Sequence, residues 1–115
     1  MAGKQKTGLP EELAARAAAM KDLIAYQAGG IVSRQIIQKP VGSVTLFAFD
    51  KAQALSEHTA PFDALVQVLD GTVEIAIAGE PLTVKAGQSI IMPANRPHAL
   101  RALTKMKMLL TMIRQ

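Results

Sequence analysis

The chain has 115 residues, of which 50% are hydrophobic and only 3% aromatic, and its formal net charge is +4. This length suits a single domain, whose core must be built from aliphatic side chains and methionine. The absence of cysteine excludes a disulfide scaffold, a cysteine nucleophile and a thiolate metal site. The small basic excess lacks interleaved aromatic residues for base stacking, so we expect no nucleic-acid partner.

No apolar run approaches the roughly 18 residues that a membrane span requires. The first residues contain two lysines, but no apolar region with a small-residue cleavage site follows them. We therefore expect a cytoplasmic protein with no membrane partner.

The N-terminal 30 residues predict a tail followed by a helix. Residues 1–8 are polar and show no periodicity, so we expect a disordered tail. Pro10 suits the first position of a helix, and acidic residues follow it in the first turn. Residues 9–30 are thus assigned to a helix, from Pro10 to Ile24, and its connection. Its predicted apolar stripe consists of Leu13, Ala17, Met20 and Ile24.

From residue 31 to 115 the pattern changes to short β-rich runs separated by Gly and Pro, which is typical of an all-β sandwich or barrel. The predicted strands are Ile31–Gln38, Ser43–Phe49, Ala64–Asp70, Thr72–Ala78, Leu82–Lys85, Ser89–Met92, His98–Leu103 and Met106–Arg114. In Thr72–Ala78, apolar and other residues alternate as expected for a half-buried strand. Gly79-Glu80 is interpreted as the hairpin turn that follows it.

Two stretches carry a spaced pattern of glycine, histidine and proline. The first extends from residue 52 to 71 and has Ala52, His58, Ala60, Ala64 and Gly71 at its key positions. The second extends from residue 87 to 102 and has Gly87, Pro93, Asn95, His98 and Ala102. Together they resemble the paired motifs of the cupin superfamily, matching five of the ten defining positions. The resemblance implies a small jelly-roll β-barrel of the RmlC-like type with a short N-terminal helix.

The departures from the family pattern concern the metal site. In metal-binding cupins the first motif supplies two histidines and a glutamate, and the second supplies another histidine. This chain keeps His58 and His98 but has Ala60 and Ala64 at the other two positions. The resemblance thus implies a shared pocket with an incomplete two-histidine site for one divalent metal ion, whereas catalytic zinc sites have at least three protein ligands.

Other side chains are candidate pocket residues or ligands. Gln67 and Asp63 are close in sequence, but period-two alternation places both on the opposite face from Ala64 unless a bulge near Pro61 changes the phase. Met92 precedes the Pro93 turn and is assigned with Gln67 to the pocket wall. A stripe of methionines in the last strand is interpreted as core filling rather than as copper ligands.

Three functions remain open. A binding module would hold a small, largely apolar ligand that the two histidines orient by hydrogen bonds. A metal-dependent dioxygenase, isomerase or decarboxylase would act on a small oxygenated substrate and would need a third ligand. A structural role would use the barrel as a dimerisation unit, and we expect a homodimer in any case.

Overall fold

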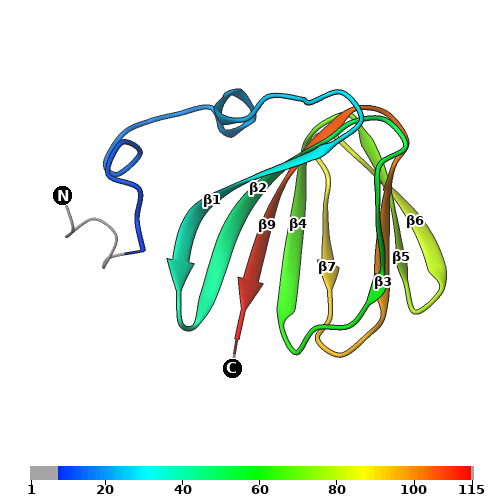
Figure 1. Cartoon of the computed structure of the whole chain (residues 1–115). Coiled ribbons are helices and arrows are strands. Elements are labelled where there is room, and N and C mark those ends of the chain that lie inside the picture. Colours follow the sequence, from blue (N-terminus) through cyan, green and yellow to red (C-terminus); the bar gives the residue numbers. More distant parts are fainter. Residues whose placement is uncertain (1–7, 115) are drawn as a thin grey trace.

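The computed structural model describes residues 8–114, which form two antiparallel sheets facing each other (Figure 1). The five-stranded sheet has the order β1-β2-β9-β4-β7 and the four-stranded sheet the order β3-β8-β5-β6. The strands are β1 (Ile31–Lys39), β2 (Gly42–Phe49), β3 (Ala54–His58), β4 (Asp63–Asp70), β5 (Thr72–Ile77), β6 (Glu80–Lys85), β7 (Ser89–Met92), β8 (His98–Ala102) and β9 (Met106–Ile113). Most connections cross from one sheet to the other, so the predicted all-β jelly roll is confirmed.

The eight predicted strands are all present, with ends that differ by at most two residues. β3 was not predicted, because its five residues are mostly exposed and show no clear alternation. The predicted turn at Gly79-Glu80 is wrong by one residue. The turn consists of Ala78 and Gly79, with φ of 51° and 83°, and Glu80 already pairs with Ile77. Positive φ at both central residues is characteristic of the type I′ turn, one of the common two-residue hairpin turns.

The main core lies between the two sheets. It contains the inward-facing side chains of alternate residues, such as Val66 and Val68 of β4 and Val73 and Ile75 of β5. The methionines of β9 belong to it, since Met106 and Met108 are buried, which confirms their interpretation as core residues. The alternation predicted for β5 is confirmed as well.

The predicted helix from Pro10 to Ile24 is wrong. Among the described residues the helical structure is a single 3-10 turn, η1 (Met20–Leu23), and Ala15 interrupts the preceding turn with φ of 58°. Leu13, Met20 and Ile24 nevertheless pack on the barrel as expected, as part of a second hydrophobic cluster, while Ala17 is exposed. Alanine buries little apolar area, so the packing of the larger side chains on the sheet overrides the high helix propensity of this run. The tail expected at residues 1–8 lies, except for Gly8, outside the described residues.

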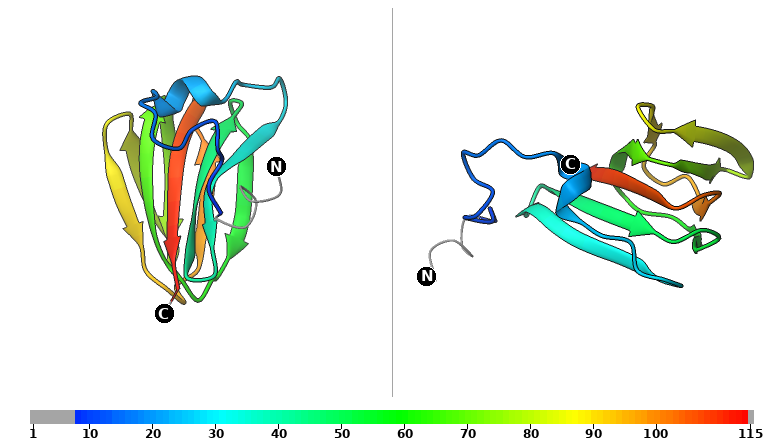
Figure 2. Two further views of the ribbon diagram at one scale, coloured as in Figure 1. Left: turned by 90° about the vertical axis from the view of Figure 1, so that its left-hand side faces the viewer. Right: turned by 90° about the horizontal axis from the view of Figure 1, so that it is seen from above.

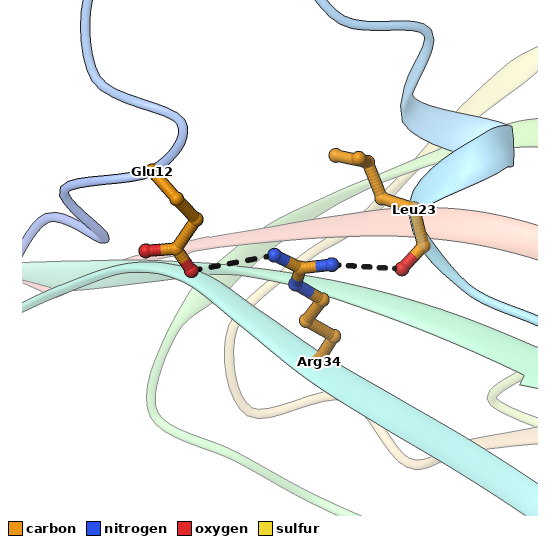
Figure 3. A network of polar contacts seen from close by, with 3 residues as sticks. All are labelled: Glu12, Leu23 and Arg34. Atoms are coloured by element: carbon orange, nitrogen blue, oxygen red, sulfur yellow. Dashed lines mark hydrogen bonds and ion pairs between the residues drawn. The ribbon is translucent and has the colours of Figure 1, made fainter.

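The N-terminal segment, residues 8–30, lies outside the two sheets (Figure 2). Arg34 of β1 holds it from one side, because its guanidinium donates to the Leu23 carbonyl at 3.1 Å and lies 3.5 Å from the Glu12 carboxylate (Figure 3). Lys107 of β9 donates to the Lys21 carbonyl at 2.7 Å. The segment is therefore fixed to both β1 and β9. No helix in residues 8–114 has the length and apolarity needed to cross a membrane.

The Tyr26 hydroxyl donates a hydrogen bond to the Asp70 carboxylate at 2.5 Å, which joins the end of this segment to β4. Burial and the Asp70 carboxylate both raise the pKa of Tyr26 well above its ordinary value of 10.0. The folded protein thus retains the phenol proton where the unfolded chain loses it. The stabilisation that the protonated Tyr26 hydroxyl provides is complete below pH 10 and is lost as the pH rises above that value.

We expect the unfolding free energy of the wild type to fall more steeply above pH 10 than that of Tyr26→Phe, because the variant has no phenol to ionise. Denaturant unfolding across the alkaline range measures this difference. Tyr26 is the single tyrosine and the chain has no tryptophan, so the ultraviolet absorbance of phenolate follows its ionisation directly. Parallel pH profiles for the two proteins would contradict the prediction.

Candidate functional site

The two histidines meet on neighbouring strands of the four-stranded sheet. His58 is the last residue of β3 and His98 the first residue of β8, and they are directly paired in the antiparallel ladder. His98 also pairs with Ile77 of β5 on its other side and is only 7% exposed, whereas His58 is exposed. The expected convergence of His58 and His98 is therefore present in the structure.

A β-bulge turns His58 toward His98. Leu55 pairs with Leu100, but the next pair is His58 with His98, so Ser56 and Glu57 lie opposite a single residue of β8. In a regular strand, residue 57 would share the inner face with Leu55. The extra residue changes the phase and places His58 there instead. The bulge thus lies before His58, not near Pro61, and Ser56 and Glu57 are exposed strand residues.

Backbone carbonyls fix the orientation of both rings. His58 Nδ1 lies 2.8 Å from the Ser56 oxygen, and His98 Nδ1 lies 3.2 Å from the Arg96 oxygen. A carbonyl oxygen only accepts hydrogen bonds, so each Nδ1 carries a hydrogen and donates it. In the neutral imidazole the other nitrogen, Nε2, then has a free lone pair. Each histidine thus presents Nε2 as its acceptor.

The two Nε2 atoms are 3.1 Å apart, and the rings meet edge to face with centroids 4.3 Å apart. Two bare lone pairs at this distance repel unless an electrophilic species lies between or beside them. A second proton on one ring, a metal cation or the donor hydrogen of a ligand would each satisfy both nitrogens. A second hydrogen on one ring satisfies the pair internally, whereas two neutral rings accept from a donor of a bound molecule.

A metal ion fits this donor set poorly. The two free Nε2 atoms provide two ligands of the kind that zinc, copper or nickel accepts. Ala64, on the inner face of β4, and Ala60, in the β3–β4 loop, stand where the metal-binding cupins have the other ligands. Within residues 8–114 no group of three or more His, Cys, Asp or Glu side chains is arranged to hold a metal ion. The four-ligand site of the family is therefore not present.

The structure places the two other predicted pocket residues, Met92 and Gln67, on opposite sides of the five-stranded sheet. Met92 is buried in the main core and pairs with Ala64, so it lies on the inner face beside the histidine end of the barrel. Gln67 alternates with the buried Val66 and Val68 and pairs with Leu109, which belongs to the outer cluster. The structure thus brings Met92 to this end of the barrel and places Gln67 on the outside. Asp63 accepts a hydrogen bond from the Ala94 N–H at 2.9 Å and serves the turn before His98.

The turn before His98 is fixed to the loop after His58. Besides the Asp63 bond, the Asn95 N–H donates to the Ala60 carbonyl at 2.8 Å. Asn95 stands at a glycine position of the family motif and has φ of 66°. Ala52 stands at another such position and has φ of 71°. The left-handed backbone typical of glycine is thus retained at both positions, although the residues differ.

Arg114 is predicted from the sequence only as the end of the last strand, and Phe62 has no predicted role. In the structure the guanidinium carbon of Arg114 lies 4.7 Å from the centre of the Phe62 ring, at the end of the barrel where the β3–β4 loop runs. The alternation of β9 could have indicated this position of Arg114, because it puts Arg114 on the same face as Met112.

Comparison with known proteins agrees with this architecture. The family model described as Cupin domain matches residues 45–114. A conserved protein of unknown function from Streptococcus pyogenes is 35% identical, with 88% of this chain and 89% of that chain covered and a TM-score of 0.84. A cupin 2 conserved barrel domain protein from Leptotrichia buccalis is 41% identical with a TM-score of 0.80, and the alignment covers 82% of this chain but 46% of that longer one.

A cupin superfamily protein from Desulfitobacterium hafniense has the same fold at 23% identity, with a TM-score of 0.84 and coverage of 94% of this chain and 96% of that one. No significant match was found among curated proteins. The matched family model, the jelly-roll topology and the paired histidines at the motif positions lead to one conclusion: the chain belongs to the cupin family.

Proposed function

We propose that this cupin binds a small molecule at the histidine end of its barrel, and that a hydroxyl or N–H group of the ligand donates to the Nε2 atoms of His58 and His98. The observation that carries the proposal is the convergence of two Nε2 acceptors, 3.1 Å apart, whose Nδ1 atoms are committed to backbone carbonyls. The backbone carbonyls orient both rings, and the Nε2 atoms left as acceptors favour a ligand that has a donor group.

Alanine at positions 60 and 64 supports the same function. A metal-binding cupin has imidazole and carboxylate side chains at these places, whereas a methyl group occupies far less volume. The neighbours of Ala64 on the inner face, Met92 and Met112, are apolar. A ligand bound here would thus contact an apolar wall and direct its donor group to the histidines, as small-molecule sites generally do.

The test uses phenol, cyclohexanol and hexanol as donor probes in the presence of EDTA. We expect binding to shift the imidazole ¹⁵N resonances of both histidines, detected by NMR. His58→Asn should weaken binding about fivefold, the equivalent of one neutral hydrogen bond. The asparagine amide reproduces the Nδ1 donor to Ser56 but has no counterpart of Nε2. His58→Gln, which places an amide near Nε2, is the matched control and should weaken binding less.

Binding that appears only with added zinc or nickel and vanishes with EDTA would contradict this proposal and favour a metal-dependent cupin enzyme instead. Equal affinity of the wild type and His58→Asn would also contradict it, because the probes would then bind elsewhere. A homodimer, with the barrel as the pairing unit, stays a separate prediction.

A further inference from the structure

Arg114 lies next to the end of β9, at the histidine end of the barrel. Its backbone N–H donates to the Val41 carbonyl at 2.7 Å, so the β2–β9 ladder continues past Ile113. Along β9 the even-numbered residues Met106, Met108 and Met112 contact the main core. Arg114 follows β9 as an exposed residue, in phase with Met112, and its guanidinium carbon lies 4.7 Å from the Phe62 ring centre.

Arg114 and the histidine pair border the same loop. The β3–β4 loop starts after His58 and contains Phe62, on which the guanidinium of Arg114 rests. Figure 1 shows the end of the described chain, the start of β4 and the end of β3 at one end of the barrel. The five-stranded sheet therefore provides a cation at the end where the four-stranded sheet provides two acceptors.

The charge of Arg114 is not neutralised by a described residue. Within residues 8–114, Arg34 pairs with Glu12 and Arg101 pairs with Glu74, and neither ion pair includes Arg114. The acidic side chain next to Phe62 in sequence, Asp63, is engaged by the Ala94 N–H. A guanidinium that stacks on an aromatic ring and has no carboxylate partner within residues 8–114 is suited to bind an anionic group from solution, preferably a planar carboxylate.

We propose that the ligand is a small hydroxy acid, whose hydroxyl donates to the His58–His98 pair and whose carboxylate binds Arg114. This inference rests on the proposed function and adds the chemical class of the ligand. The core side chains next to one another at this end of the barrel, Ala64, Met92 and Met112, are apolar, so the body of the ligand is a short hydrocarbon chain or ring. A carboxylate alone offers no hydrogen to the two Nε2 acceptors, which is why the hydroxyl is part of the class.

The test compares straight-chain acids from hydroxypropanoate to hydroxyhexanoate, with the hydroxyl at the end remote from the carboxylate. Each acid is matched by the alkanol and by the alkanoate of equal length, and affinities are measured by calorimetry with EDTA present. We expect one chain length to bind at least about tenfold more tightly than the alkanol, which lacks the charged contact, and about fivefold more tightly than the alkanoate, which lacks the neutral hydrogen bond to the histidines.

Arg114→Met should remove this advantage and leave the affinity for the alkanol unchanged, whereas Arg114→Lys should retain part of it because the charge remains. If the hydroxy acids bind no better than the alkanols while His58→Asn weakens both, the inference is wrong and the proposed function stands. If none of the three series binds, and phenol, cyclohexanol and hexanol do not bind either, both are wrong.

Discussion

Gly71→Ala is expected to lower the free energy of unfolding by about 3 kcal/mol or more, as the sum of backbone strain and an overpacking clash. Gly71 joins β4 to β5 with φ of +74°, a conformation that costs any residue with a Cβ about 1–2 kcal/mol. A Cβ built on it would lie 2.0 Å from the Lys105 carbonyl oxygen and 2.6 Å from Thr104 Oγ1. The backbone oxygen cannot move without disturbing the start of β9.

Gly87→Ala is the matched control for this prediction. Gly87 has φ of +88°, but its Cβ would meet no atom within 4 Å. It should cost only about 1–2 kcal/mol, the strain of the left-handed backbone alone. Urea unfolding of the three proteins measures both costs. Equal losses for the two variants would show that the contact with Lys105 is relieved easily and that the clash argument is wrong.

Restoring the two missing family ligands should create a metal site. The double variant Ala60→His/Ala64→Glu has the four-ligand set of the metal-binding cupins, together with His58 and His98. Without metal we expect it to be about 2 kcal/mol less stable than the wild type, because position 64 is only 6% exposed and an unpaired carboxylate there is poorly solvated. Zinc at about 100 times its dissociation constant should then add about 2.7 kcal/mol.

Thermal unfolding with and without zinc, together with metal analysis of the purified proteins, measures this gain. Ala60→His/Ala64→Gln is the control, since glutamine has the shape of glutamate but a neutral and weaker ligand oxygen. The wild type should show a much smaller zinc effect than the double variant. Absence of zinc-dependent stabilisation in the double variant would mean that positions 60 and 64 do not converge on the histidine pair in this chain.

The fold could be predicted from sequence because its determinants are local or strongly spaced. The alternation from Thr72 to Ile77, the turn glycines Gly71 and Gly87, and the motif spacing of His58 and His98 all describe features that the structure contains. Each depends on residue type and position alone. The family assignment therefore required no knowledge of tertiary contacts.

The details of the site depend on geometry that no spacing encodes. The sequence of β3 is mostly polar and shows no alternation, so the strand could not be predicted. The bulge at Ser56-Glu57 changes the phase of this strand, so the inward orientation of His58 could not be predicted from alternation either. The nitrogen that each ring presents depends on distances to the Ser56 and Arg96 carbonyls. The helix expected from Pro10 failed for a similar reason, because contacts with a distant sheet outweigh local propensity.

The left-handed residues Ala52 and Asn95 have an evolutionary consequence. Both residues stand at glycine positions of the family motifs and have the positive φ that glycine favours. The backbone conformation of these loops therefore does not require glycine at either position. The geometry of this end of the barrel and the chemistry that it carries can then change independently. If the proposed ligand site and the double variant behave as expected, substitutions at a few codons exchange a metal centre for an organic ligand site, or the reverse, within one fold.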